Sequence, residues 1–319
     1  MKIVVLDAGT VNPSDISWER LNRVGEVTVY ESTPPERVIE RIGDAPIIVC
    51  TRTRIRREVF EQCPGLKYVG LFATGYNIID TAAAKEHGVV VCNVPGYSTE
   101  AVAQFVFALL LEICHHVPAY DSLVRTGRWE EAPGRYASAL PLMELKDKTM
   151  GIIGMGDIGY RTAQIAAAFG MRVLGTRRHP DPRMETDSIR FTDLDTLLRE
   201  SDVISLHCPL FPETRNLIDK AAIAKMKDGA ILINTARGPI LNERDVADAL
   251  NSGKLWGAGV DVLSNEPPRE DNPLLHTKNC IVTPHIAWAP EETRRRLVRM
   301  VAENMEAFLS GCPIHVVNP

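Results

Sequence analysis

Short apolar runs alternate with longer amphipathic stretches through the first hundred residues. The apolar runs are Ile3–Leu6, Val27–Tyr30, Ile47–Cys50, Tyr68–Phe72 and Val89–Cys92. Helices are predicted between them, near Ser17–Arg23 and near Pro35–Ile42. Strands that alternate with helices favour a parallel sheet with right-handed crossovers, so this part of the chain is expected to form one α/β unit.

The same alternation returns after residue 147 and continues almost to the end of the chain. The predicted strands are Lys148–Ile153, Met171–Leu174, Val203–Leu206, Ala230–Asn234, Gly257–Val262 and Cys280–Thr283. The predicted helices are Tyr160–Phe169, Leu194–Arg199, Ile223–Met226, Glu243–Ser252 and Glu291–Leu309. The pattern predicts a second complete α/β unit, followed by a short tail, Pro313–Val317, that returns to the first.

Two breaks interrupt this alternation. Pro95–Ser98 ends the first run of strands and helices, and a long helix is predicted from Ser98 or Thr99 through Cys114. Pro118–Leu145 then shows no clean periodicity. An irregular segment inside a compact domain is usually functional or covered by other structure, and contact with a second subunit would explain this one. We interpret the first break, Pro95–Ser98, as a domain junction.

The composition is that of a soluble globular protein, with 45% hydrophobic and 24% charged residues. A length of 319 residues suggests two domains of ordinary size. The net charge of −5 favours neither a nucleic-acid partner nor an anionic membrane surface, and no apolar run reaches membrane-spanning length. The apolar start of the chain is typical of a buried strand rather than a signal peptide, so a cytoplasmic location is expected.

The seven cysteines are scattered, and no two form a C-x-x-C pair. Their odd number and wide spacing argue against a disulfide framework, so we interpret them as small core residues in a reducing compartment. The pair His115-His116 suggests metal binding, but adjacent helical side chains diverge by about 100°. We predict no metal site.

A glycine-rich turn connects the first strand and helix of the second unit. Gly154, Gly156 and Gly159 form a G-x-G-x-x-G pattern after an apolar strand, with Asp157 and Ile158 at the start of the helix. The first glycine permits a tight turn, the second lets a pyrophosphate approach the backbone, and the third lets the helix pack closely on its strand. In this context the pattern predicts a dinucleotide-binding turn rather than a purely structural one.

The strand after this helix bears on the choice of nucleotide. About 20 residues after the first glycine, an NAD site usually carries Asp or Glu for the ribose 2′-hydroxyl. Here Arg177 and Arg178 follow that strand. Arginines attract a 2′-phosphate, so NADP(H) is favoured and NAD(H) remains possible. The alternative is that both arginines are exposed and bind no ligand.

Ionisable residues follow the last strands of the second unit. Arg237, Glu266 and His285 each come shortly after a predicted strand, and the carboxyl ends of such strands face the ligand crevice of α/β proteins. In the first unit, Arg52 follows a strand and could attract an anion, unless it belongs to a solvated helix start. Backbone amides at Thr74-Gly75 could hold a carboxylate, unless they form only a tight turn.

Several motifs together resemble the D-isomer-specific 2-hydroxyacid dehydrogenases over essentially the whole chain. They are Gly154–Gly159, His207–Leu210 with Thr214, Asn234–Gly238, Asp261–Pro267 and Thr283–Ala287. The resemblance implies two doubly wound parallel-sheet α/β domains: a flavodoxin-like substrate domain of residues 1–99 plus 288–319, and a Rossmann NAD(P)-binding domain of residues 100–287. It also implies a cleft between them that closes on substrate, and a homodimer formed through the nucleotide domains and the segment Pro118–Leu145.

The resemblance further implies a role for each matching residue. Arg237 would bind the carboxylate of a 2-oxo acid and polarise its carbonyl, His285 would give the oxygen a proton, and Glu266 would orient the imidazole and favour its acid form. Asp261 would bind the nicotinamide carboxamide, and Thr74-Gly75 would hold the substrate carboxylate. The remaining positions expected at the coenzyme are Val102, Thr176, Cys208, Pro209, Thr214, Thr235, Ala236 and Ala287.

Two further segments bear on the substrate. Gly96–Gln104 and Leu109–His116 resemble the glycerate dehydrogenases, also called hydroxypyruvate reductases, whereas Gly134–Leu140 lacks the aromatic cluster expected in that subgroup. The expected reaction is reduction of a small 2-oxo acid, hydroxypyruvate or glyoxylate preferred. The alternative is a dehydrogenase fold used as an NAD(H)-sensing, corepressor-like binding protein.

Overall fold

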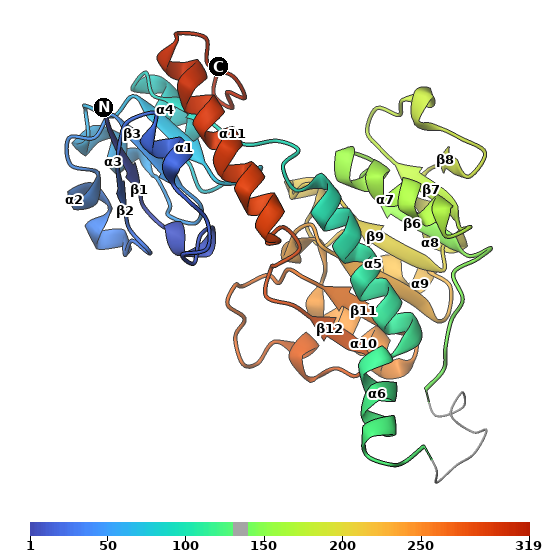
Figure 1. The fold of residues 1–319 in the computed structure, drawn as a ribbon. Coiled ribbons are helices and arrows are strands. Elements are labelled where there is room, and N and C mark those ends of the chain that lie inside the picture. Colours follow the sequence, from blue (N-terminus) through green and yellow to red (C-terminus); the bar gives the residue numbers. More distant parts are fainter. Residues whose placement is uncertain (130–139) are drawn as a thin grey trace. The chain divides into compact units, whose positions relative to one another are not determined.

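A computed structural model of the protein describes residues 1–129 and 140–319. The chain forms two compact units, one made of Met1–Ser98 with Trp288–Pro319 and the other of Thr99–Ala287 (Figure 1). Each unit contains one sheet, and every pairing within the two sheets is parallel. The predicted fold class of two parallel-sheet α/β domains is therefore confirmed.

The first unit has a five-stranded sheet in the order β2-β1-β3-β4-β5. Its strands are β1 (Lys2–Val5), β2 (Glu26–Val29), β3 (Ile47–Cys50), β4 (Tyr68–Leu71) and β5 (Val90–Cys92). This order is that of flavodoxin-like sheets, and it reverses between β1 and β3. The C-terminal tail runs along β5, where the Val317 N–H donates to the Val91 carbonyl at 2.9 Å.

Helices cover both faces of this sheet. They are α1 (Glu19–Asn22), α2 (Val38–Ile42), α3 (Arg57–Gln62), α4 (Thr81–Glu86) and α11 (Glu291–Leu309). Buried side chains of α2, α3 and α4 share one apolar core, while those of α1 and α11 share the other. Because the sheet is covered on both faces, a central strand such as β3 is buried along its whole length.

The second unit has a seven-stranded sheet in the order β12-β11-β10-β9-β6-β7-β8. Its strands are β6 (Thr149–Ile153), β7 (Arg172–Thr176), β8 (Ile189–Phe191), β9 (Val203–Leu206), β10 (Ala230–Asn234), β11 (Leu255–Val260) and β12 (Cys280–Val282). The chain leaves β6 towards β7 and β8, and then continues at β9 on the other side of β6. The order therefore reverses between β6 and β9, which is where α/β sheets bind ligands.

The helices of the second unit, apart from α6 (Val117–Arg125), also form two layers. These layers contain α5 (Thr99–His115), α7 (Asp157–Ala168), α8 (Leu194–Glu200), α9 (Lys220–Lys225) and α10 (Glu243–Ser252). The core under α5 and α7 lies on one face of the sheet, and the core under α8, α9 and α10 lies on the other. Both layers fix β6 and β9–β12, whose carboxyl ends carry the predicted site residues.

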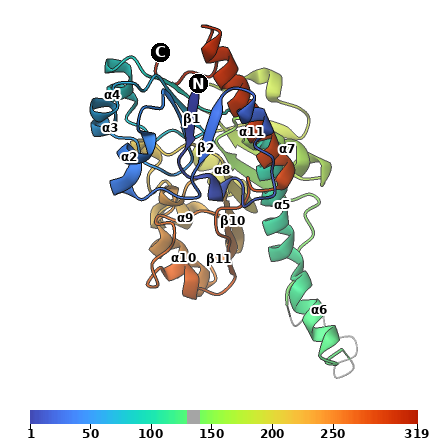
Figure 2. The same cartoon turned by 60° about the vertical axis from the view of Figure 1, so that its left-hand side comes forward.

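Three sequence predictions need correction. Residues 118–125 are helical, within α6, because Pro118 suits the first turn of a helix; α6 buries no residue and extends away from its sheet (Figure 2). The short strand β8 was not predicted. Cys312 is exposed and Cys280 only partly buried, so the seven free cysteines are not all core residues.

Part of the irregular segment predicted at Pro118–Leu145, including most of Gly134–Leu140, lies outside the described residues. Among residues 1–129 and 140–319, no single helix meets the length and hydropathy needed to cross a bilayer; α5 and α6 meet it only together, across a 50° bend. No cluster of three or more His, Cys, Asp or Glu side chains suited to a metal ion occurs in the same part of the chain.

Candidate active site

The predicted site residues of the second unit lie along one edge of its sheet. Because all strands are parallel, the loops after β12, β11, β10, β9, β6 and β7 emerge at the same edge in that spatial order. His285 follows β12, Arg237 follows β10 and Gly154 follows β6. Strands lie about 4.8 Å apart, so the loops after β10 and β7 are separated by about 14 Å. An elongated ligand would span this edge.

The glycine turn has the geometry expected of a dinucleotide-binding turn. Gly154 has φ +99°, and a Cβ there would lie 2.5 Å from the Cys208 nitrogen. A Cβ on Gly159 would overlap the Gly154 carbonyl oxygen, whereas one on Gly156 would meet no atom within 4 Å. Gly154 and Gly159 are therefore required by the fold itself. The open space at Gly156, at the start of α7, fits an approaching phosphate.

The end of β7 lies directly beside this turn. The Thr176 carbonyl accepts hydrogen bonds from the N–H groups of Gly154 and Met155 at 3.2 and 2.8 Å. Arg177 and Arg178 follow and are exposed. Neither forms an ion pair with a carboxylate in the part of the chain that the structure describes, and the nearby Asp181 carboxylate is paired with Arg183. The side-chain hydrogen bond from Arg183 lowers the pKa of the Asp181 carboxyl to about 2.

The loop after β9 carries Cys208 and Pro209. Burial raises the pKa of the Cys208 thiol to about 11, so the sulfur stays protonated and apolar at neutral pH. The Thr214 hydroxyl donates to the Pro209 carbonyl at 2.8 Å and accepts from the Phe211 N–H at 2.7 Å. Through these two hydrogen bonds, the Thr214 side chain stabilises the conformation of the loop after β9.

The loop after β10 carries Arg237. The buried Asn234 side chain accepts from the Ala236 N–H and donates to the Arg237 carbonyl, both at 3.0 Å. A Cβ on Gly238 would overlap the Leu263 backbone, so glycine lets this loop lie against the loop after β11. The Thr235 hydroxyl is buried without a hydrogen-bond partner among the described residues. An unpaired buried hydroxyl on this edge is consistent with a ligand that completes its hydrogen bonding.

The loops after β11 and β12 bring Glu266 and His285 together. The His285 Nδ1 lies 2.7 Å from a Glu266 carboxylate oxygen, and the two side chains are 29% and 31% exposed. The Leu263 N–H donates to the other Glu266 oxygen at 3.2 Å. Within residues 1–129 and 140–319, His285 Nε2 makes no hydrogen bond. The pair presents one oriented, partly exposed imidazole nitrogen.

Asp261 directly follows β11 and is only 1% exposed. One carboxylate oxygen accepts from the Thr283 hydroxyl at 2.6 Å and the Ile286 N–H at 2.9 Å, and the other accepts from the Ala287 N–H at 2.9 Å. Burial raises the pKa of the Asp261 carboxyl, while these three hydrogen bonds oppose the shift. Asp261 therefore contacts the turn that contains His285.

Three predicted substrate residues belong to the first unit. The buried Asp7 carboxylate accepts from the N–H groups of Thr51, Arg52 and Thr53 at 2.6–2.7 Å, leaving the exposed Arg52 side chain for any anion. The Thr74 hydroxyl donates to the Val94 carbonyl at 2.8 Å. The N–H groups of Thr74 and Gly75 make no hydrogen bond within the described residues, as a carboxylate-binding loop requires.

Sequence reasoning missed the polar side chains that hold these loops. Asn234 and Asp7 accept hydrogen bonds from backbone N–H groups, and the Thr283 hydroxyl donates to the Asp261 carboxylate. A polar residue at or just after the end of an apolar strand was the available signal. It also missed His207, whose Nε2 lies 2.8 Å from the Ser205 hydroxyl oxygen. Burial lowers the pKa of His207 to about 3, so its imidazole is neutral.

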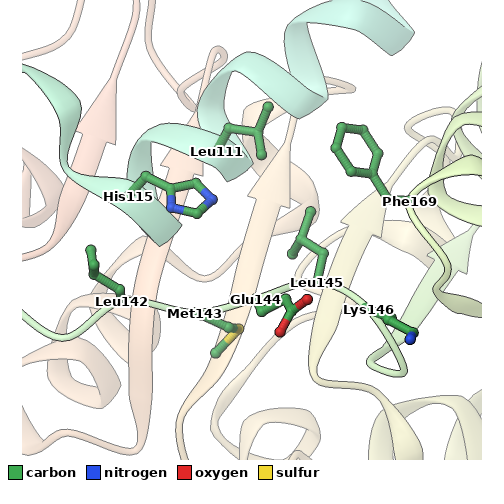
Figure 3. A pocket seen from close by; sticks show the side chains of 8 residues that line it. All are labelled: Leu111, His115, Leu142, Met143, Glu144, Leu145, Lys146 and Phe169. Carbon is green, nitrogen blue, oxygen red and sulfur yellow. The ribbon is translucent and has the colours of Figure 1, made fainter.

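A hollow of about 510 Å³ lies elsewhere on the second unit. Figure 3 shows Leu111 and His115 on α5, the segment Leu142–Lys146, and Phe169 around it. Its lining is mostly apolar and includes none of the predicted catalytic or coenzyme residues. The ionisable residues predicted to carry the chemistry lie instead along the carboxyl edge of the sheet.

Comparisons with known proteins agree with the motifs. The family model described as D-isomer specific 2-hydroxyacid dehydrogenase, NAD binding domain, matches residues 107–287. The chain is 52% identical to a hydroxypyruvate reductase from Blautia hydrogenotrophica, over 100% of both chains. It is 38% identical to a glyoxylate reductase from Thermofilum pendens, over 90% of this chain and 86% of the relative.

The fold is also similar to solved structures. One is an acyclic imino acid reductase, Bsp5, in complex with NADPH and D-Arg. The TM-score is 0.87 at 33% identity, over 99% of this chain and 100% of that one.

Proposed function

Because the chain belongs to the D-isomer-specific 2-hydroxyacid dehydrogenase family, we propose that it reduces hydroxypyruvate or glyoxylate to the D-2-hydroxy acid, with NADP(H) as the favoured coenzyme. The observation that carries this proposal is the 2.7 Å contact between His285 and Glu266 on the sheet edge that also carries the glycine turn. The full-length similarity to a hydroxypyruvate reductase supports the substrate class.

His285 acts as the proton donor in this proposal. Its Nδ1 is held by the Glu266 carboxylate, so the proton for the substrate resides on Nε2. In the reduction, the protonated imidazole gives this proton to the carbonyl oxygen. A positioned general acid of this kind contributes about 10²–10⁴-fold to the rate. In the reverse direction the neutral imidazole accepts the proton.

Arg237 binds and polarises the substrate in this proposal. Its guanidinium suits a planar carboxylate because it offers parallel N–H donors. One donor, Nη1, bonds the Ala236 carbonyl at 2.7 Å and steadies the side chain. The other guanidinium N–H groups, which have no partner in the part of the chain that the structure describes, would bind the 2-oxo acid. A positive charge near the carbonyl oxygen stabilises the negative charge that develops there.

The bound nicotinamide coenzyme supplies the hydride. The residues proposed to hold it are the glycine turn with Asp157 and Ile158, the ends of β7, β9 and β10, and the buried Val102, Asp261 and Ala287. Arg177 and Arg178 favour NADP(H), since charge-assisted hydrogen bonds to a 2′-phosphate contribute about 1.5–3 kcal/mol each. NAD(H) remains the alternative coenzyme.

A panel assay tests the proposal directly. Purified protein is mixed with NADPH or NADH and hydroxypyruvate, glyoxylate, pyruvate or a longer 2-oxo acid, and loss of reduced coenzyme is followed by absorbance. We expect turnover with hydroxypyruvate or glyoxylate, and less with pyruvate and the longer acid. Coenzyme binding without turnover on any member would instead favour the NAD(H)-sensing, corepressor-like alternative.

We also propose a second copy of the chain as the partner, forming a homodimer. Large apolar side chains are exposed on one part of the second unit: Val117 at 63%, Val124 at 48%, Leu142 at 50% and Phe169 at 41%. They lie on α6, beside the hollow of Figure 3 and at the end of α7. Exposed apolar surface of this kind favours association with another protein surface.

A further inference from the structure

The turn that carries His285 is held by a buried carboxylate. Asp261 directly follows β11, and its carboxylate reaches the loop after β12, where it accepts three hydrogen bonds. The donors are the Thr283 hydroxyl on one side of His285 and the Ile286 and Ala287 N–H groups on the other. His285 is therefore bracketed in the chain by groups fixed to one acidic side chain.

The backbone of His285 requires such support. Its φ is +57°, in the left-handed region. For a residue with a Cβ this conformation is unfavourable, and it persists only where surrounding contacts determine it. The His285 N–H donates to the Thr283 carbonyl at 3.0 Å, which closes the turn around the imidazole.

Two carboxylates therefore act on His285 in different ways. Glu266 binds the ring at Nδ1 and sets its rotation. Asp261 binds the backbone of Ile286 and Ala287 and the Thr283 side chain, and so fixes the backbone position from which the His285 side chain extends. A carboxylate has about four acceptor sites, and three of those of Asp261 are used within the protein. About one acceptor site of Asp261 therefore remains for the nicotinamide carboxamide, the contact that the family resemblance implies.

We propose that Asp261 and Thr283 are positioning residues for His285, acting on the reaction through the turn that carries it. This inference rests on the proposed function, in which His285 donates the proton. Its consequence is that losing the Thr283 hydroxyl slows the chemical step without weakening coenzyme binding. Displacing a reacting group by about 1 Å costs about 10²-fold in rate, so even partial loosening of the turn has a measurable effect.

Thr283 is the better residue for the test, because Asp261 is itself among the expected coenzyme contacts. Thr283→Val removes the hydroxyl while keeping the β-branched shape. Thr283→Ser keeps the hydroxyl. Thr277→Val is the matched control, since the Thr277 hydroxyl bonds the Pro273 carbonyl elsewhere in the same unit.

Three quantities are measured on each full-length variant: kcat, the coenzyme Kd from nicotinamide fluorescence, and hydrogen exchange of the peptide containing Ile286 and Ala287. For Thr283→Val we expect kcat to fall at least about tenfold, an unchanged Kd and faster exchange. Thr283→Ser should restore most of kcat, and Thr277→Val should match the wild type.

An unchanged kcat in Thr283→Val, or a Kd that rises in step with the loss of kcat, would overturn the inference. So would unchanged exchange of the Ile286 and Ala287 amides. A wild-type protein without turnover would instead defeat the proposed function. In that case, hydrogen exchange of the Ile286 and Ala287 amides, measured without coenzyme, would still test whether Asp261 and Thr283 hold this turn.

Discussion

At the scale of single residues, the candidate site depends on polar side chains whose hydrogen bonds leave one functional group available. His285 bonds Glu266 through Nδ1 and presents Nε2. Among the described residues, the Arg237 side chain bonds the Ala236 carbonyl through Nη1, and its other N–H groups have no partner there. Each side chain is oriented before a ligand arrives, which reduces the entropy lost when the substrate is bound.

Replacing His285 tests its proposed role. His285→Ala removes the proton donor while leaving the glycine turn intact, so kcat should fall by about 10²–10⁴-fold. Coenzyme affinity, measured by fluorescence titration, should stay close to that of the wild type. Glu266→Gln is the companion variant, with a smaller loss because the imidazole remains. Normal turnover in His285→Ala would remove this residue from the mechanism.

Replacing Arg177 tests the choice of coenzyme. Arg177→Asp introduces a carboxylate that repels a 2′-phosphate and can accept from a ribose hydroxyl. The ratio of kcat/KM for NADPH to that for NADH should fall by tenfold or more, since one lost charge-assisted bond is worth about 1.5–3 kcal/mol. Arg183→Asp, which changes an arginine already paired with Asp181, is the control. An unaltered ratio would show that Arg177 does not contact the nucleotide.

The lowered pKa of His207 should make the free energy of unfolding depend on pH. Its folded pKa is about 3 and its unfolded pKa is about 6.5, so between these values the unfolded chain binds the additional proton. The free energy of unfolding therefore falls as pH drops below about 6.5, by up to about 1.4 kcal/mol per unit from this residue. His207→Gln should show a weaker loss of Tm between pH 7 and pH 5 than the wild type. Parallel Tm curves would contradict this account.

At the scale of elements, close approaches between loops and strands assemble the site. Gly238 lets the Arg237 loop lie against the Leu263 backbone, and Gly159 lets α7 lie against the Gly154 turn. The Thr214 hydroxyl donates within the loop after β9, and the Asn234 and Asp261 side chains accept from backbone N–H groups of the loops after β10 and β12. These hydrogen bonds hold the three loops. The functional groups come from loops, but buried strands fix where those loops begin.

Gly156 and Gly159 belong to the same turn, but we expect Gly159 to matter for stability and Gly156 for coenzyme binding. A Cβ on Gly159 would overlap a backbone oxygen, so Gly159→Ala should destabilise the protein by about 1–3 kcal/mol. A Cβ on Gly156 would meet nothing within 4 Å, so Gly156→Ala should keep the wild-type Tm. It should nevertheless weaken coenzyme binding at least about tenfold, because the methyl group occupies the space proposed for the pyrophosphate. Scanning calorimetry and fluorescence titration measure the two effects, and unchanged coenzyme affinity in Gly156→Ala would move the phosphate site elsewhere.

At the scale of the whole molecule, the proposed homodimer accounts for the exposed apolar surface of the second unit. Val124 is 48% exposed on α6, a helix that buries none of its residues. Val124→Asp would place a charge in the proposed interface, where an unpaired carboxylate opposes association. Light scattering should show a dimer for the wild type and a monomer or a much weaker dimer for the variant. Val29→Asp, the same substitution at a valine that is 38% exposed on β2 of the first unit, is the matched control, and a wild-type monomer would refute the proposal.

Much of the fold could be predicted from the chain alone. Continuous apolar runs such as Ile47–Cys50 and Ala230–Asn234 are strands with the predicted bounds, because a strand buried on both faces is apolar throughout. The two departures, β8 and α6, are elements with little burial, and residues that contact little core carry a weak periodicity. The membership of the dehydrogenase family, predicted from five motifs, is confirmed by the family match and the relatives.

The sequence by itself determined the alternation of strands and helices, the glycine turn and the kinds of ionisable residue placed after the strands. These depend on local propensity, on side-chain periodicity and on which residues permit a positive φ. Tertiary structure alone decided that Asp261 binds the turn of His285 and that Asp7 binds the loop of Arg52. These partners lie 26 and 45 residues apart in the chain, and they meet only because the sheet sets their strands side by side.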